Sequence, residues 1–294
     1  MCRRQYYYHY YGSWGGWERS APPLARKLYI LKKVISLPLL VGDVIHRTVA
    51  EALGGIMSGN PISVESSERR AVGQFRAAWR SSKRREWESQ PRKPNLFEHY
   101  YGGEVTPERL LRMRDTILRC MRNFYASGHY GFLQGLGREQ WLATETLDSF
   151  QVSGTKVWAT LDLAVRSEGK VRVYDWKSGQ RAGDDIRQMG VYGLYAAARW
   201  RKLPKNILLT TVYLRDGTSR GVHFGASELN DAEALIRESS GKMRDLLREP
   251  DRACPDDFPM VEDPAYAAAA RSRRSAMPTG AAFGRRRPLG RSPG

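Results

Sequence analysis

Two adjoining segments with strictly alternating apolar residues constrain the fold of this chain more than any other feature. TKVWATLDLAV (155–165) and VRVYDWK (171–177) flank the short turn sequence SEGK. Alternation with period two is typical of β-strands, and two such segments around a Gly-containing turn predict a β-hairpin. The second strand is unusual because it ends in an acid, Asp175, and a lysine, Lys177. Residues two apart in a strand direct their side chains to the same face, so Asp175 and Lys177 are expected to lie together.

The register of the hairpin predicts where the charged residues lie. If Glu168-Gly169 form a two-residue loop, Asp162 lies directly opposite Asp175 on the face that carries Lys177. The other face is apolar and consists of Leu161, Leu163, Val165, Arg172, Tyr174 and Trp176. Two facing carboxylates repel each other, so the arrangement suggests a divalent cation between them. A solvent-exposed polar face, with Lys177 offsetting the acids, explains the hairpin alone equally well.

The rest of the pattern predicts an α/β protein whose first half is mainly helical. Helices are expected at 39–53, at 66–92, from Thr106-Pro107 onward, at 183–200 and at 226–247, and a second hairpin at 206–224. The helix at 183–200 follows Lys177 closely enough to fold back over the first hairpin. Gly190 and Gly193 in this helix would allow close approach to the sheet.

Composition divides the chain into three parts. Residues 1–24 form an aromatic segment rich in Tyr and Trp, which could pack on the body or stay mobile. Residues 25–250 are expected to form the folded domain, with a helical insertion at about 62–135. Pro, Ala, Gly and Arg dominate residues 251–294, a composition typical of a disordered basic tail.

The charge of the chain suggests a polyanionic partner. The formal net charge is +17 over 294 residues, and the pI is about 10.0. Seven arginines and no acids occur between Arg271 and Gly294, which leaves +10 on the rest. Nucleic acid is the first partner that such an excess indicates. A basic protein without a specific polyanionic partner is the alternative.

Cysteine spacing and hydropathy indicate a cytoplasmic protein without a membrane partner. The three cysteines (Cys2, Cys120 and Cys254) are far apart, so neither a disulfide framework nor a zinc site is indicated. No apolar run approaches the roughly 20 residues that span a bilayer. The N-terminal residues also lack the apolar centre of a signal peptide.

An ordered set of polar residues resembles a known family. Asp162, then DWKSG (175–179), then Gln188-x-x-x-Tyr192 resembles the D…(D/E)xK…QxxxY pattern of the RecB-like branch of the PD-(D/E)XK nucleases. His46, in VGDVIHRTV, is similar to a histidine that this branch carries on an early helix. Taken alone, Gln188 and Tyr192 would be ordinary helix surface and His46 a structural residue. CRISPR-associated exonucleases with an iron–sulfur cluster are similar as well.

The resemblance covers about residues 25–60 and 140–250, and it implies both fold and chemistry. The implied fold is a restriction-endonuclease-like core of helix, β-hairpin, helix and β-hairpin. The implied ligands of Mg²⁺ or Mn²⁺ are His46, Asp162, Asp175 and the backbone carbonyl of Trp176. Lys177 would orient water or stabilise charge that develops on phosphorus, and Gln188 and Tyr192 would position the strand or Lys177 itself.

The implied function is a metal-dependent nuclease, most simply a DNA exonuclease that favours single-stranded DNA. RNA is not excluded, and protein partners are not indicated. The basic run at Arg80–Arg85 and the aromatic N-terminus could follow a nucleic-acid backbone and stack bases. A solvated helix face is the alternative for both.

One departure from the relatives concerns their iron–sulfur cluster. The relatives carry one cysteine near the N-terminus and three late ones spaced C-x₂-C-x₅-C. Cys2 matches the first, but Ala267, Ala270 and Ala276 stand at the late positions. Four thiolates usually hold such a cluster, so we expect no iron–sulfur cluster in this protein. In the relatives the cluster connects the two ends of the chain, and whether the ends are connected here is left open. Decay to a catalytically inactive nucleic-acid-binding protein of the same fold is the alternative function.

Overall fold

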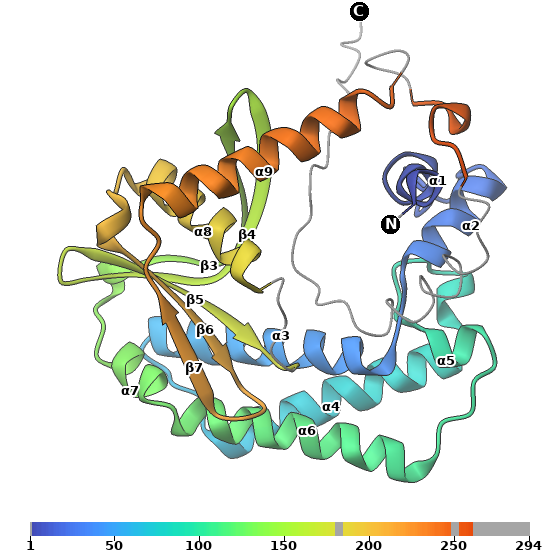
Figure 1. Cartoon of the computed structure of the whole chain (residues 1–294). Coiled ribbons are helices and arrows are strands. Elements are labelled where there is room, and N and C mark those ends of the chain that lie inside the picture. Colours follow the sequence, from blue (N-terminus) through green and yellow to red (C-terminus); the bar gives the residue numbers. More distant parts are fainter. Residues whose placement is uncertain (1, 180–184, 248–252, 261–294) are drawn as a thin grey trace, which may run out of the picture.

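The computed structural model describes residues 2–179, 185–247 and 253–260, and the expected insertion is helical (Figure 1). The helices before the large sheet are α1 Arg3–Tyr7, continued by a π-helical turn at Tyr8–Gly12, α2 Pro23–Lys32, α3 Leu37–Met57, α4 Val64–Lys83, α5 Phe97–Tyr100, α6 Pro107–Ala126 and α7 Gly128–Gln134. Two short strands, β1 Val34–Ile35 and β2 Asn95–Leu96, pair in parallel. Thr106 caps α6 as expected, because its hydroxyl accepts from the Arg109 N–H. The division of the chain into three parts stays a prediction.

A five-stranded mixed sheet forms the centre of the fold. Its elements are β3 Trp141–Val152, β4 Thr155–Ser167, β5 Lys170–Lys177, β6 Ile207–Tyr213 and β7 Thr218–Val222, with α8 Asp185–Trp200 and α9 Ala226–Arg244. The strand order is β3-β4-β5-β6-β7, and only β5 and β6 are parallel. A parallel pair needs a crossover, and α8 supplies it. The expected α/β class and restriction-endonuclease-like core are confirmed.

Both predicted hairpins are confirmed. Ser167 pairs with Lys170 across a loop in which Glu168 has φ 52° and Gly169 has φ 73°. These two left-handed residues are typical of the turn that matches the twist of paired strands. The second hairpin, β6–β7, turns at Asp216-Gly217, where Gly217 has φ 69°.

The sheet contains one strand that the sequence pattern does not predict. β3 precedes the first hairpin and pairs antiparallel with β4. Its central residues, Glu145, Thr146 and Leu147, are all exposed. Alternation is therefore interrupted in the middle of the strand, which explains why period-two patterning misses it.

The expectation that Leu161 shares a face with Leu163 and Val165 is wrong. Leu163 and Val165 pack with α3 and α6, whereas Leu161 belongs to the cluster beneath α8 and α9. The change of face coincides with an interruption of the β3–β4 ladder. Thr144 pairs with Leu163 and Thr146 with Leu161, but Glu145, with φ 47°, and Asp162 between them form no pair. A local irregularity of this kind re-aims side chains.

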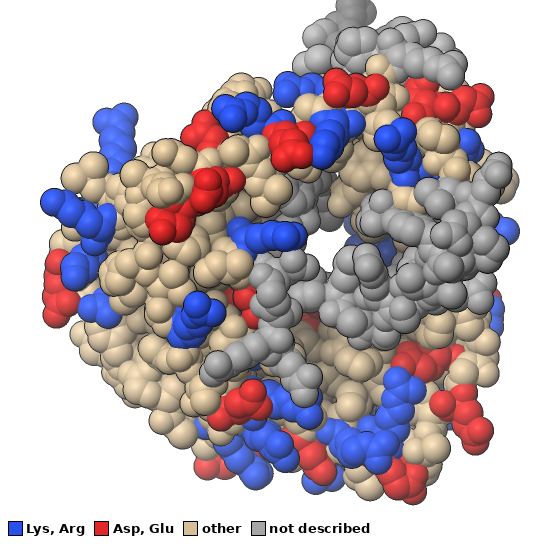
Figure 2. All heavy atoms as spheres, viewed as in Figure 1, with Lys and Arg blue, Asp and Glu red and all other residues tan. Residues whose placement is uncertain are grey.

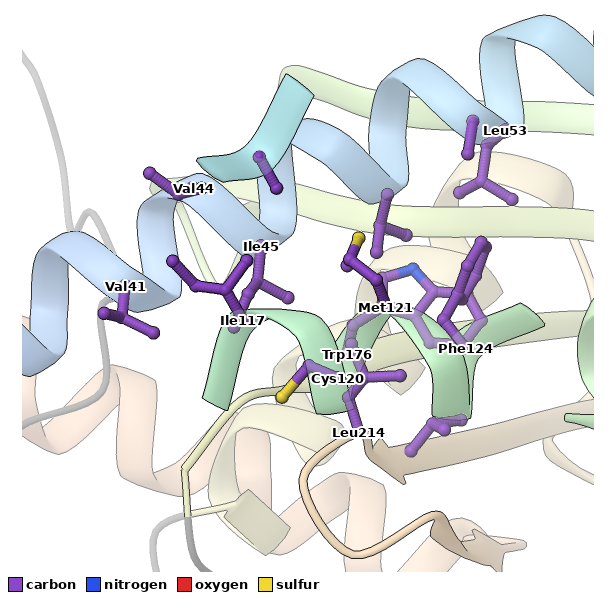
Figure 3. Close-up of a cluster of buried hydrophobic side chains, with 14 of the residues drawn as sticks. Val41, Val44, Ile45, Leu53, Ile117, Cys120, Met121, Phe124, Trp176 and Leu214 are labelled. Carbon is purple, nitrogen blue, oxygen red and sulfur yellow. The ribbon is translucent and has the colours of Figure 1, made fainter. Parts of the chain in front are cut away.

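Two apolar clusters cover the two faces of the sheet. The first joins α3, α4 and α6 to one face, and part of it is shown in Figure 3. Trp176 lies at its centre with 1% of its surface exposed, edge-on to Phe124 and stacked on Tyr174. The second cluster lies between the other face and helices α8 and α9. Alternation therefore buries Trp176 on one side of β5 and directs Asp175 and Lys177 to the other.

The two glycines of α8 permit close contact with α9, and one of them also permits the expected approach to the sheet. A Cβ on Gly190 would lie 2.9 Å from the Ala232 Cβ of α9, and a Cβ on Gly193 would lie 2.8 Å from Leu229 Cδ2. The closest approach is therefore between α8 and α9. Only Gly193 also approaches the sheet, at 3.4 Å from Leu209 Cδ1.

The N-terminal aromatic segment packs on Phe258, in the last described stretch of the chain. Phe258 is fully buried, with its ring 5.4–6.1 Å from those of Tyr6, Tyr7 and Tyr11. The Arg4 Nε donates to the Phe258 carbonyl at 2.7 Å. The two ends of the described chain are thus joined by aromatic packing. No helix among the described residues is long and apolar enough to cross a bilayer.

Candidate active site

Asp162 links the strands at the base of the site. The β4–β5 ladder ends at Leu163 and Tyr174, one residue short of Asp162 and Asp175. Beyond that point the Asp162 Oδ2 accepts the Trp176 N–H at 2.7 Å, so the carboxylate binds a backbone donor of β5. The same oxygen lies 3.5 Å from His46 Nδ1. The side chain is thus held from two sides and is almost fully buried.

Asp175 and Lys177 lie together on the α8 side of β5, as the hairpin predicts. Asp175 is 1% exposed, and its Oδ2 lies 3.0 Å from the Lys177 Nζ. Burial, followed by repulsion from Asp162, raises the pKa of Asp175 to about 7 against the opposing attraction of Lys177 and His46. An ionised Asp175 is therefore short of positive charge in the protein alone.

Gln188 and Tyr192 of α8 hold the lysine in place. The Lys177 Nζ donates to Gln188 Oε1 at 2.6 Å, and the Gln188 Nε2 donates to the Tyr192 hydroxyl at 2.6 Å. The Tyr192 hydroxyl in turn donates to the Thr160 carbonyl of β4 at 2.9 Å. Spacing of four residues puts Gln188 and Tyr192 on one helix face, which makes this chain of hydrogen bonds continuous. Of the two roles expected for the pair, the contacts favour positioning of Lys177.

His46 reaches the site from α3. Burial disfavours its charged form, but Asp162, Glu145 and Asp175 together raise the pKa of His46 to about 10. One turn earlier on the helix, a Cβ on Gly42 would lie 3.1 Å from Ser178 Oγ. Glycine at this position therefore lets α3 approach the end of β5.

A third carboxylate, Glu145, completes the arrangement, and the sequence pattern does not predict it. Its Oε1 lies 3.9 Å from His46 Nδ1, and ligand atoms of His46, Glu145 and Asp162 all lie within 4.8 Å of one another. Glu145 is the unpaired residue of β3 opposite Asp162, in a left-handed conformation that is strained for a residue with a side chain. No sequence signal marks it, because β3 itself is not predicted.

Comparison with known proteins identifies the family. Residues 1–258 match the family model described as the PD-(D/E)XK nuclease superfamily. The chain belongs to this superfamily. A comparison with curated proteins finds no match. The match covers the N-terminal segment, the helical insertion and the sheet, and it leaves the RecB-like branch a prediction.

PD-(D/E)XK nucleases use divalent metals, and the residues of this site fit such a cation. Hard cations prefer carboxylate oxygens, and Glu145, Asp162 and Asp175 supply them next to one imidazole. Asp162 and Asp175 are both buried and repel each other even with the Lys177 ammonium 3.0 Å from the Asp175 Oδ2, so a cation between the two carboxylates would stabilise their ionised forms. Of the four expected ligands, His46 and Asp162 belong to the compact group with Glu145, and Asp175 adjoins Asp162 on the buried side. Their roles as ligands, and that of the Trp176 carbonyl, stay predictions.

We expect protein purified without oxygen to contain no stoichiometric iron and no visible absorption from sulfur-to-iron charge transfer. Cys120 is fully buried in α6, and burial raises the pKa of its thiol to about 12, which disfavours a thiolate there. Cys2 and Cys254 are then the remaining cysteines, while Ala267, Ala270 and Ala276 lie outside the described residues. Iron analysis and a visible spectrum provide the measurement, and a cluster would overturn the alignment of the C-terminal third.

Proposed function

We propose that the protein is a Mg²⁺- or Mn²⁺-dependent DNA exonuclease of the RecB-like branch that acts in the cytoplasm and favours single-stranded DNA. The observation that carries the proposal is the Lys177 ammonium, held between the Asp175 carboxylate and the Gln188 amide beside the other acids. A superfamily match alone supports a nuclease in general. The ordered lysine supports an active one, because an inactive binder has no need to orient it.

The site residues divide the work between holding a cation and meeting the phosphate. His46, Glu145, Asp162 and Asp175 are the groups that would hold the cation. When bound, the cation supplies Lewis-acid polarisation of the phosphodiester and lowers the pKa of water. A chain of hydrogen bonds through Gln188 and Tyr192 to the β4 backbone fixes the Lys177 ammonium. Its charge therefore needs no reorganisation when negative charge develops on phosphorus.

The charge distribution supports a polyanionic substrate without selecting DNA over RNA. Lys and Arg exceed Asp and Glu by 17. Figure 2 shows Lys and Arg side chains over the lower helices, interspersed with Asp and Glu.

Linear and circular DNA, labelled at one end or internally, test the proposal. With Mg²⁺ or Mn²⁺ we expect progressive loss of linear single strands, slower loss of duplex, and no cleavage of circular single strands. EDTA should abolish the reaction, and Asp162→Asn should match the EDTA control. Cleavage of circular DNA would show that the activity is that of an endonuclease and not that of an exonuclease. Binding without cleavage under either metal would favour the alternative, a catalytically inactive nucleic-acid-binding protein. The same assay with labelled RNA determines whether the enzyme prefers DNA or RNA.

A further inference from the structure

An aromatic and cationic surface extends from the N-terminal segment towards the candidate active site, and the chemistry described above does not use it. Its outer end is Trp14, whose side chain is 42% exposed. A single exposed aromatic residue is common, but Trp14 is one of several adjoining rings with cations beside them, and such a combination favours a binding surface. We call the group formed by Trp14, Trp17, Tyr29, Lys33 and Arg92 the aromatic track.

The aromatic track is continuous from ring to ring. The ring centroids of Trp14 and Trp17 are 5.3 Å apart, and those of Trp17 and Tyr29 are 5.4 Å apart. The Arg92 guanidinium lies 5.7 Å from the Trp17 ring centre, and the Lys33 Nζ lies 5.7 Å from that of Tyr29. Tyr29 is buried and Trp17 half-buried, so they support Trp14 from behind. The track therefore presents the partly exposed Trp14 side chain on a buried aromatic base, with one cation beside each of the two inner rings.

The inner end of the track leads into α3, the helix that carries His46. Lys33 directly follows α2 and is separated from α3 by only three residues. The track therefore adjoins the beginning of the helix that reaches the candidate cation site.

We propose that the aromatic track binds unpaired bases of a single-stranded nucleic acid whose phosphodiester lies at the candidate active site. This inference rests on the proposed function and names its substrate class. Bases stack on aromatic side chains irrespective of sequence, and nearby cations attract the phosphates. Duplex bases are already stacked on one another, so the track discriminates in favour of single strands. The cations beside the rings make a polyanion a better occupant than an apolar protein partner.

Binding of a fluorescent oligo-dT strand in EDTA tests the proposal, with Trp14→Ala as the main variant. We expect its Kd to rise at least about five-fold, the lower end for loss of one base-stacking contact. An abasic strand of the same length should be unaffected, because it keeps the phosphates and lacks the bases. Trp14→Tyr should retain most of the affinity. Trp158→Ala is the matched control, since Trp158 of β4 also lies under a cation, Lys156, at 4.4 Å but outside the track.

Two outcomes would contradict the proposal that the aromatic track binds bases. One is an unchanged oligo-dT affinity in Trp14→Ala, and the other is an equal loss with the abasic strand or in Trp158→Ala. Melting curves of all variants exclude unfolding as the cause. Hydrolysis of bis(p-nitrophenyl) phosphate, which has no base to stack, should be the same in Trp14→Ala and wild type. If neither wild type nor any variant hydrolyses a phosphodiester, the proposed nuclease function is wrong. The oligo-dT and abasic binding data still show whether the aromatic track binds bases.

Discussion

Replacing Lys177 with alanine should lower the rate of DNA hydrolysis by about 10²–10³ and leave DNA affinity nearly unchanged. Loss of one preorganised charge-stabilising group costs roughly 3–4 kcal/mol of transition-state stabilisation. Lys177 is one of 48 Lys and Arg residues, so its removal should change the salt dependence of binding by at most about one unit. Single-turnover rates at saturating DNA, with Kd values from EDTA titrations, separate the two effects.

The contacts of Lys177 provide graded controls. Gln188→Ala removes the acceptor that holds the Nζ at 2.6 Å but keeps the charge, so a smaller loss of rate is expected. Lys242→Ala removes a lysine that pairs with Glu238 on the surface of α9, and it should have no effect on rate. Equal hydrolysis by Lys177→Ala and wild type would remove Lys177 from the chemistry. Absence of hydrolysis in both would make the binding protein the better account.

Local patterning predicts the part of the site that lies on one continuous stretch of chain. The two-residue loop at Glu168-Gly169 determines the register of β4 and β5, and this places Asp162, Asp175 and Lys177 near one another before any tertiary contact is known. The four-residue spacing of Gln188 and Tyr192 adds a shared helix face. These are short-range consequences of backbone geometry, so the sequence predicts them well.

The residues that the sequence misplaces depend on tertiary packing. Glu145 joins the site because the β3–β4 ladder is interrupted there, and the same interruption moves Leu161 to the opposite face from Leu163. A prediction from strict alternation assumes a regular strand, so it cannot detect side chains that change face where the ladder is interrupted. Gly190 and Gly193 signal close packing, but only the structure shows that α9 is the partner.

Millimolar Mn²⁺ or Mg²⁺ should raise the melting temperature by about 5–10 °C at pH 8. A ligand at 100 times its Kd that binds only the folded state contributes about 2.7 kcal/mol, and each kcal/mol shifts the melting temperature of a protein of this size class by about 2–4 °C. Asp162→Asn should abolish the gain, because Asp162 adjoins both His46 and Asp175. Asp115→Asn, which changes an exposed acid paired with Arg114, should keep it.

The gain should also increase with pH, because the cation competes with protons in the site. Asp175 has a pKa of about 7 in the folded protein and about 3.9 in the unfolded chain, so the folded state holds a proton that the unfolded state has lost. Without a cation, this group therefore lowers the free energy of unfolding as pH rises from about 4 to about 7. A cation compensates the ionised carboxylate and also displaces the proton of His46, whose pKa is about 10. The shift in melting temperature should thus be larger at pH 8 than at pH 5.5. A shift that is absent at both pH values, or equal in Asp162→Asn, would count against a cation among these residues.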